Sequence, residues 1–214
     1  MSKAAIMLGG GKSLGDVRPK DLRLPTLALN HHAIAAGLDV DMVVACDPPV
    51  HRHYEKYLPD PRPLKLIRSV LKDDPISPKV DRTFKDCPNV EFFESSTGGD
   101  FRTYFTRPTV YWGDFPFPTS VGYLGIRSTM ISAFRLLWDK GFRSIYLMGV
   151  DMAAGRGMPS DHNGFSHDLA QMLSDRLKAL VPIFDKAGLK VFNATPQSAL
   201  KCFPFRSVPS SGGA

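Results

Sequence analysis

Short apolar runs that end in Gly, Asn or Asp recur along the chain and alternate with helical patterns. This succession is typical of a mostly parallel sheet whose strands are buried on both faces by helices. We predict strands over residues 3–8, 26–29, 41–46, 144–150 and 190–194, with weaker candidates over 89–95 and 109–112. The expected fold class is α/β, a Rossmann-like, mostly parallel sheet with helices on both faces.

Two segments carry helical periodicity. A helix is predicted over residues 126–140, with Gly141 as its left-handed C-terminal cap and a buried face of Ile126, Met130, Phe134 and Leu137. It leads directly into the strand at 144, so it is a crossover helix. A second helix is predicted over roughly 167–187, ending at Gly188 and kinked or broken at Pro182. Its buried stripe is predicted to consist of Leu169, Leu173, Leu177, Leu180 and Phe184.

The segment 48–118 differs in texture, because eleven of the eighteen prolines fall within it, between short charged pieces and aromatic residues. It is too long for a simple loop, so we interpret it as a Pro-rich insertion that packs over the sheet, where it can form part of the site. Within it, residues 61–72 are predicted as an amphipathic helix. Its basic face is interpreted either as a solvated surface or as a surface that binds an acceptor or anion, and consists of Arg62, Lys65, Arg68 and Lys72.

Length and composition fit one large α/β domain. At 214 residues with 43% hydrophobic content, we expect a single domain over residues 1–206 and a disordered tail over 207–214. The three cysteines, Cys46, Cys87 and Cys202, form no C-x-x-C pair and fit a reducing compartment. No apolar run approaches the roughly 20 residues that span a bilayer, so a cytoplasmic protein without a membrane partner is expected. The net charge of +6 indicates an anionic partner, such as a nucleotide, a polyanionic acceptor or a nucleic acid.

The stretch AIMLGGGKSLGD, residues 5–16, looks like a phosphate-binding P-loop but departs from it. In a P-loop the first glycine would stand where this chain has Ile6, inside the first predicted strand. Gly9 and Gly11 supply two glycines of a dinucleotide fingerprint, but Leu14 takes the place of the third. The loop is therefore predicted to be a glycine turn that lets a nucleotide approach the backbone, the alternative being a tight turn without a ligand.

Polar residues or glycines follow each of the five main predicted strands. In an open α/β sheet ligands bind beyond the carboxyl ends of the strands, so these residues would together surround a nucleotide's base, ribose and phosphates. Each one alone is typical of a turn or a helix cap. They are the segment from Gly9 to Ser13, then Asn30, Asp47, Gly149 with Asp151, and Asn193.

Five pieces of the sequence occur in the same order as the motifs of a known group of proteins. The pieces are MLGGGKSL, LALNHH, VVACDPP, the run from PTSVGYLG to YLMGVDM, and VFNATPQSAL. In this order they resemble the family 42 sialyltransferases and the related domain of archaeal-type 6-hydroxymethylpterin diphosphokinases, a group also found in phage proteins. Lys12 stands where the sialyltransferase loop has Pro, and Val121 interrupts the family's Thr-Ser-Gly sequence.

The resemblance implies a bound nucleotide, with Asp151 near its ribose or near a metal. In the sialyltransferases the donor is a cytidine-monophosphate sugar and no metal is needed; in the diphosphokinases the nucleotide is ATP with Mg. Arg127, at the start of the long helix, is also suited to a phosphate. The resulting candidate nucleotide-binding residues are Gly9, Gly10, Gly11, Ser13, Asn30, Asp47, Ser120, Arg127, Gly149 and Asn193.

Transfer of a sugar to a hydroxyl needs a base for the proton and groups that stabilise the leaving phosphate. The glycine-rich segment 155–168 follows Asp151 and carries Arg156, His162 and His167. Since the sialyltransferases have a histidine-bearing loop here, His162 or His167 is the candidate general base, with Asp151 beside it. The alternatives are that His167 simply lies in the first turn of the next helix, and that the segment binds a metal.

The leading hypothesis is a nucleotide-sugar-dependent glycosyltransferase that transfers a sugar to an acceptor hydroxyl. The aromatic cluster around Trp112 would stack on a sugar or base, or else pack in the core. A modified base in DNA is one candidate acceptor, motivated by charge alone. The alternatives are an ATP- and Mg-dependent diphosphokinase of a small alcohol such as a pterin, and a non-catalytic nucleotide- or DNA-binding protein. The sequence leaves the sugar, the nucleobase, the acceptor and the oligomeric state open.

Overall fold

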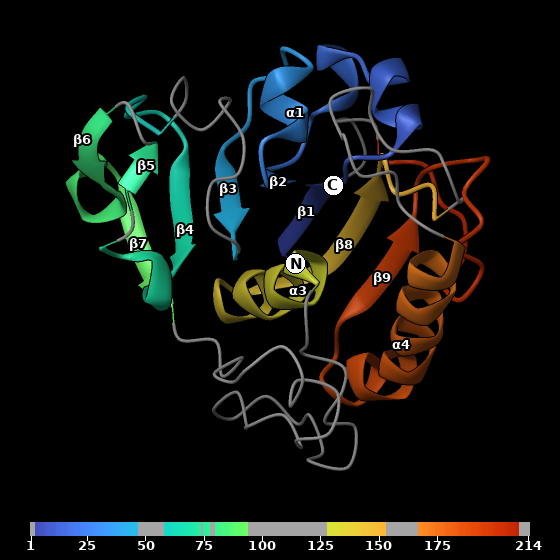
Figure 1. Ribbon diagram of the computed structural model, residues 1–214. Coiled ribbons are helices and arrows are strands. Elements are labelled where there is room, and N and C mark those ends of the chain that lie inside the picture. The colour runs from blue at the N-terminus through green and yellow to red at the C-terminus, as the bar shows by residue number, and fades with distance from the viewer. Residues whose placement is uncertain are drawn as a thin grey trace.

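A parallel sheet forms the centre of the molecule (Figure 1). The computed structural model describes residues 3–46, 58–73, 75–77, 80–93, 128–152 and 167–209. Within these residues seven strands pair in the order β7-β4-β3-β2-β1-β8-β9, and every neighbouring pair is parallel. The strands are β1 (Lys3–Leu8), β2 (Thr26–Leu29), β3 (Met42–Ala45), β4 (Leu64–Arg68), β7 (Val90–Phe93), β8 (Phe142–Met148) and β9 (Lys190–Asn193). A separate antiparallel pair joins β5 (Pro75–Ser77) to β6 (Val80–Thr83).

The predicted α/β class and the five main strands are confirmed. Alternate residues of each strand enter two cores on opposite faces of the sheet, as expected for parallel strands covered on both sides. In β1, Ala5 and Met7 lie in one core, whereas Ile6 and Leu8 lie in the other, and all four side chains are fully buried. The weaker candidate at 89–95 is confirmed as β7, and the one at 109–112 lies outside the described residues.

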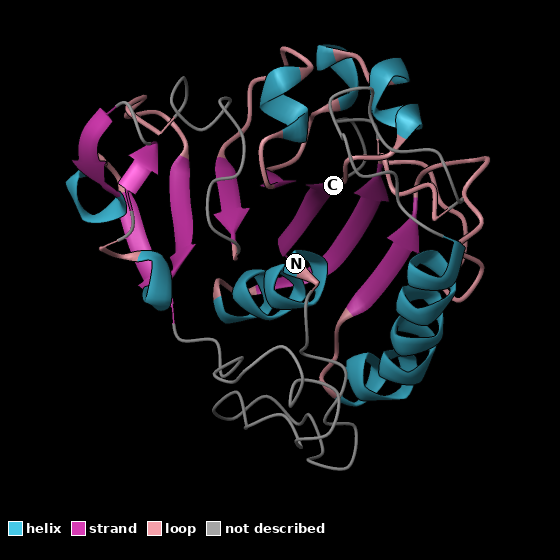
Figure 2. Ribbon diagram, in the orientation of Figure 1, coloured by secondary structure: helices cyan, strands magenta, loops and turns pink. Residues whose placement is uncertain are grey.

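Helices α3 (Thr129–Asp139) and α4 (His167–Lys186) pack into one core, and the short α1 (His32–Ala35) packs into the other. Figure 2 shows α3 lying across the sheet and α4 flanking β9. Gly141 and Gly188 follow α3 and α4 in the left-handed conformation, at φ of 85° and 68°, as predicted. The helix α4 is continuous through Pro182, so the predicted break is absent there. The 3₁₀ turns are η1 (Lys12–Asp16), η2 (Pro19–Asp21), η3 (Ser69–Leu71) and η4 (Phe84–Asp86).

Residues 61–72 do not form the predicted amphipathic helix, because they build β4 and the turn η3. The spacing of Leu64, Ile67 and Leu71 matches a helix as well as a strand, and the pairing of β4 between β3 and β7 decides for the strand. The prolines at 61 and 63 also favour an extended chain before it. Two parts of the predicted insertion, β4 and β7, therefore extend the sheet.

The predicted disordered tail is described only at its start. Residues 207–209 have no helix or strand, and half-buried Val208 packs against the core that contains Ile6 and Leu8. Residues 210–214 lie outside the described residues.

Candidate functional site

Within the described strands the chain changes direction across the sheet between β1 and β8. After β1 it builds β2, β3, β4 and β7 on one side, and it then crosses over to add β8 and β9 on the other. In open α/β sheets, ligands bind at the carboxyl ends of the strands where such a switch occurs. The spatial order β3-β2-β1-β8-β9 also confirms that the five strands chosen for their polar ends are neighbours.

The glycine loop after β1 is bound along its length to the segment that follows β8. The Gly9 N–H donates to the Met148 carbonyl oxygen at 2.8 Å, and the Gly11 N–H donates to the Gly149 carbonyl oxygen at 2.7 Å. The Ser13 N–H donates to Asp151 Oδ2 at 3.0 Å, and the Ser13 hydroxyl donates to Asp151 Oδ1. The two segments thus form one hydrogen-bonded unit at the switch point.

Close packing explains why this loop needs glycines. A Cβ at Gly9 or Gly11 would lie 2.5 Å or 2.7 Å from the Gly149 carbonyl oxygen. A Cβ at Gly10 would lie 2.5 Å from His32 Cδ2. The sequence reasoning attributed the glycines to the approach of a nucleotide, but in the structure they allow the approach of Gly149 and His32.

Asp151 connects the glycine loop to the turn after β9. Its side chain accepts both Ser13 hydrogen bonds, and the residue is only 8% exposed. Its main-chain carbonyl oxygen accepts the Ala199 N–H at 2.8 Å, and the Ser198 hydroxyl donates to the preceding Val150 carbonyl oxygen. The carboxylate therefore orients the glycine loop from the end of β8.

Asn30 and Asn193, predicted to contact the nucleotide, use their side chains differently. The Asn193 amide donates to the Leu200 carbonyl oxygen at 3.0 Å, and its Oδ1 accepts the Thr195 N–H at 2.9 Å. It therefore shapes the turn after β9. Asn30 is left-handed, at φ of 57°, and no donor among the described residues reaches its buried Oδ1. A buried acceptor without a partner costs about 1–3 kcal/mol, so Asn30 is the stronger candidate for a ligand contact.

Lys65 does not belong to an anion-binding surface, and that prediction is wrong. The residue is fully buried, and its Nζ donates to the carbonyl oxygens of Pro63 at 3.0 Å, Pro88 at 2.9 Å and Asp60. Burial lowers the pKa of the Lys65 ammonium. Three carbonyl acceptors match the three donors of an ammonium group, so Lys65 joins the loops that precede β4 and β7.

The other three basic residues do not share one face either. Arg62 is 70% exposed and pairs with Asp60 at 2.6 Å; the Arg62 hydrogen bond lowers the pKa of Asp60 to about 2. Lys72 is exposed beyond η3. Arg68 ends β4, and its Nη1 donates to the Cys46 carbonyl oxygen, just after β3, at 3.5 Å. Among the described residues no acceptor reaches its buried Nε, so Arg68 remains a candidate anion contact at the carboxyl edge.

Sequence reasoning missed His31 and His32, which follow Asn30 at the end of β2. His31 is 1% exposed, and the two imidazole centroids lie 4.3 Å apart. Since a Cβ at Gly10 would meet the His32 ring, the pair supports the glycine loop from the β2 side. The doubled histidine directly after an apolar run was the available signal.

Several predicted site residues fall where the structure gives no side-chain position. His167 is the first residue of α4, and its side chain is not described. Within the described ranges, no three His, Cys, Asp or Glu side chains gather as a metal site. No helix in those ranges combines the length and apolar character of a membrane span. The predicted site residues that lie outside the described ranges are Asp47, Trp112, Ser120, Arg127, Arg156 and His162.

Solved structures share this architecture. The sialyltransferase CstII from Campylobacter jejuni, in complex with the substrate analogue cytidine-5'-monophosphate, superposes with a TM-score of 0.53 at 17% identity, over 96% of this chain and 85% of that chain. The chain therefore has a sialyltransferase-like fold. CstII in complex with CMP-3FNeuAc gives a TM-score of 0.50 at 17% identity, over 97% and 87% of the two chains. The sialyltransferase CST-II in complex with a trisaccharide acceptor and CMP gives a TM-score of 0.50 at 15% identity, over 96% of this chain and 86% of that chain. No protein-family model and no curated protein matches the chain.

Proposed function

We propose that the protein is a glycosyltransferase that transfers a sugar from a cytidine nucleotide to an acceptor hydroxyl. The observation that carries the proposal is the hydrogen-bonded unit formed by the glycine loop and residues 148–151, at the switch point of a sialyltransferase-like sheet. Solved neighbours with this fold are complexes with CMP and with CMP-3FNeuAc, which supports a cytidine nucleotide as the donor.

The direction of the Ser13 hydrogen bond indicates which part of the nucleotide lies beside it. The Ser13 hydroxyl donates its single proton to Asp151, so its oxygen can only accept from a ligand. A ribose hydroxyl or a base amino group can donate to it, whereas a phosphate oxygen cannot. The buried Oδ1 of Asn30 also needs a donor, because an amide oxygen carries no proton and can only accept. We therefore assign this side of the site to the nucleoside rather than to the phosphate.

In the proposed reaction the acceptor oxygen bonds to the anomeric carbon while the bond from that carbon to the phosphate oxygen breaks. The acceptor proton passes to His162 or His167, and the nucleotide leaves with the electron pair. Asp151 acts through Ser13, as a positioning residue for the loop.

We do not extend the proposal to DNA as the acceptor. That idea rested on a common basic face of Arg62, Lys65, Arg68 and Lys72, and these residues do not form one. The diphosphokinase alternative has no described residue that specifically favours it over sugar transfer.

A thermal-shift screen with CMP, CDP, UDP, GDP, ADP and ATP, each with and without Mg, tests the proposal. We expect CMP to stabilise the protein without Mg. Asn30→Gly keeps the left-handed backbone and removes one hydrogen bond, so it should weaken CMP binding by about 0.5–1.5 kcal/mol, or roughly two- to twelvefold. Asn89→Gly is the matched control, because exposed Asn89 is also left-handed, at φ of 51°, and precedes β7. Stabilisation by ATP only with Mg, or by no nucleotide, contradicts the proposal.

A further inference from the structure

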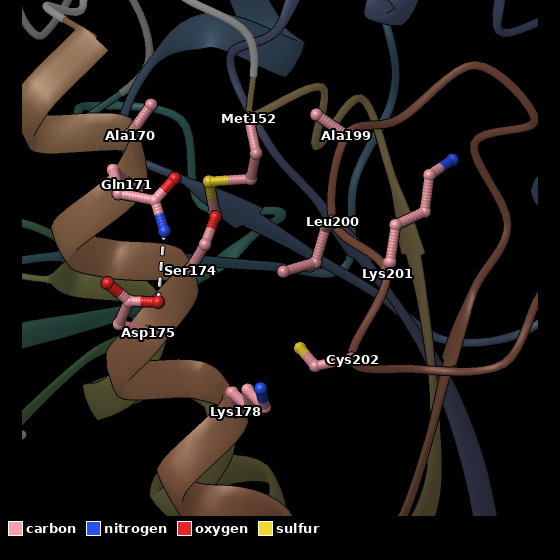
Figure 3. Close-up of a pocket in the computed structure, with 10 residues that line it drawn as sticks. All are labelled: Met152, Ala170, Gln171, Ser174, Asp175, Lys178, Ala199, Leu200, Lys201 and Cys202. Atoms are coloured by element: carbon pink, nitrogen blue, oxygen red, sulfur yellow. Dashed lines mark hydrogen bonds between the residues drawn. The ribbon is translucent and has the colours of Figure 1, made fainter.

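A cavity of about 450 Å³ lies between α4 and the segment 199–202 that follows β9 (Figure 3). Met152, in the segment that follows β8, also borders it. The helix contributes residues at positions 171, 174, 175 and 178, whose three- and four-residue spacing places them on one face of α4. The volume of the cavity lies within the range of about 300–1,000 Å³ that is typical of small-molecule sites.

The cavity adjoins the proposed nucleotide site through two consecutive residues. Asp151 accepts the Ser13 hydrogen bonds on the nucleotide side, and Met152 lines the cavity. Met152 is left-handed, at φ of 50°, which is uncommon for a residue other than Gly, Asn or Asp. Figure 3 shows its thioether turned toward Gln171 and Ser174 of α4. This left-handed turn at Met152 therefore lies between the proposed nucleotide site and the cavity.

The lining combines the two kinds of surface that a sugar ring presents. The α4 wall is polar, and Gln171 Nε2 donates to Asp175 Oδ1 at 3.0 Å, which holds an amide and a carboxylate side by side. Such a pair can both donate to and accept from neighbouring hydroxyl groups. Met152 and Leu200 supply apolar surface for ring C–H groups. The charged lining residues are Asp175, Lys178 and Lys201, and the Lys201 ammonium donates to the Ser198 carbonyl oxygen at 2.7 Å. The wall therefore offers both a hydrogen-bond acceptor and ammonium donors to the hydroxyl groups of a ligand.

We propose that this cavity binds the acceptor and that the acceptor is a carbohydrate. The assignment rests on the proposed function and names its second substrate. The α4 face that lines the cavity leads back to position 167, one turn before Gln171. An acceptor held in the cavity would therefore extend along the helix toward the candidate base and the nucleotide beyond Met152.

Alkylation of Cys202 reports occupancy directly. This half-buried thiol lines the cavity, whereas Cys46 and Cys87 are buried elsewhere and serve as internal references. The protein, saturated with CMP, is treated with N-ethylmaleimide in the presence of lactose, maltose or N-acetylneuraminic acid, and labelling is followed by peptide mass spectrometry. At a sugar concentration ten times its Kd, occupancy should slow Cys202 labelling about tenfold.

Three variants on α4 test where the sugar binds. Ser174→Trp fills the cavity and should abolish protection by the sugar, while Ala179→Trp, at an exposed position outside the cavity, should retain it. Gln171→Leu, at an exposed position, removes the amide with little risk to folding and should weaken protection. Protection that survives Ser174→Trp overturns the assignment, and so does a failure of all three sugars to protect the wild type.

The two proposals fail in different ways. CMP stabilisation without sugar protection leaves the nucleotide site standing and removes the acceptor assignment. Sugar protection without stabilisation by any nucleotide removes the transferase and leaves a carbohydrate-binding cavity.

Discussion

The hydrogen bonds between Ser13 and Asp151 should contribute measurably to stability, because they hold the glycine loop to β8 in a largely buried setting. A hydrogen bond to a charged group contributes about 1.5–3 kcal/mol. Taking the lower value for each, Asp151→Ala removes both bonds and should cost about 3 kcal/mol. Ser13→Ala removes the hydroxyl bond alone and should cost about 1.5 kcal/mol.

The double variant gives the sharper test. Asp151→Ala also removes the hydroxyl bond that Ser13→Ala removes, so the double variant should cost about as much as Asp151→Ala alone, a coupling of about 1.5 kcal/mol between the two residues. Urea unfolding at equilibrium measures all four free energies of unfolding, with an unchanged denaturant slope as the check on two-state behaviour. Ser13→Thr, which keeps the hydroxyl, is the matched control. Additive costs, or an Asp151→Ala protein as stable as the wild type, would refute the reasoning.

Two further predictions concern buried groups. Lys65→Met should destabilise the protein by about 2–4 kcal/mol, since it leaves three carbonyl oxygens without their ammonium donor. Urea unfolding measures this loss, with Lys72→Met as the control at an exposed site. Equal stabilities of the two variants would contradict the prediction. Burial raises the pKa of the Cys202 thiol from 9.0 to about 11, so its thiolate fraction at neutral pH is roughly a hundredfold below that of an ordinary thiol. Its alkylation rate should therefore keep rising up to about pH 11; a plateau above about pH 9 would contradict it.

The sheet could be predicted from the sequence because its central strands are buried on both faces. Such strands appear as continuous apolar runs, as in residues 3–8 and 26–29, and these runs need no knowledge of their neighbours. The helices over 126–140 and 167–187 were equally visible, because each has an apolar stripe and ends at a glycine.

The segment around Lys65 could not be predicted in the same way. A lysine inside an apolar run suggests a solvated face, and only the folded chain brings the carbonyl oxygens of Asp60, Pro63 and Pro88 to its ammonium. Burial of the lysine therefore depends on contacts up to 23 residues away in sequence.

The candidate site was predictable in position but not in its contacts. Strand ends placed the glycine loop and Asp151 at one edge of the sheet, but the Ser13–Asp151 bonds join residues 138 positions apart. The reason for the glycines also depended on the fold, since the atoms that exclude a Cβ at Gly9 and Gly11 belong to residues beyond β8.

A crystal structure of the protein with CMP tests the central claim most directly. We predict the nucleotide at the carboxyl ends of β1 and β8, with a ribose hydroxyl or the cytosine amino group donating to Ser13 Oγ and to Asn30 Oδ1. CMP bound away from this edge, or bound there with its phosphate against Ser13, would contradict the account.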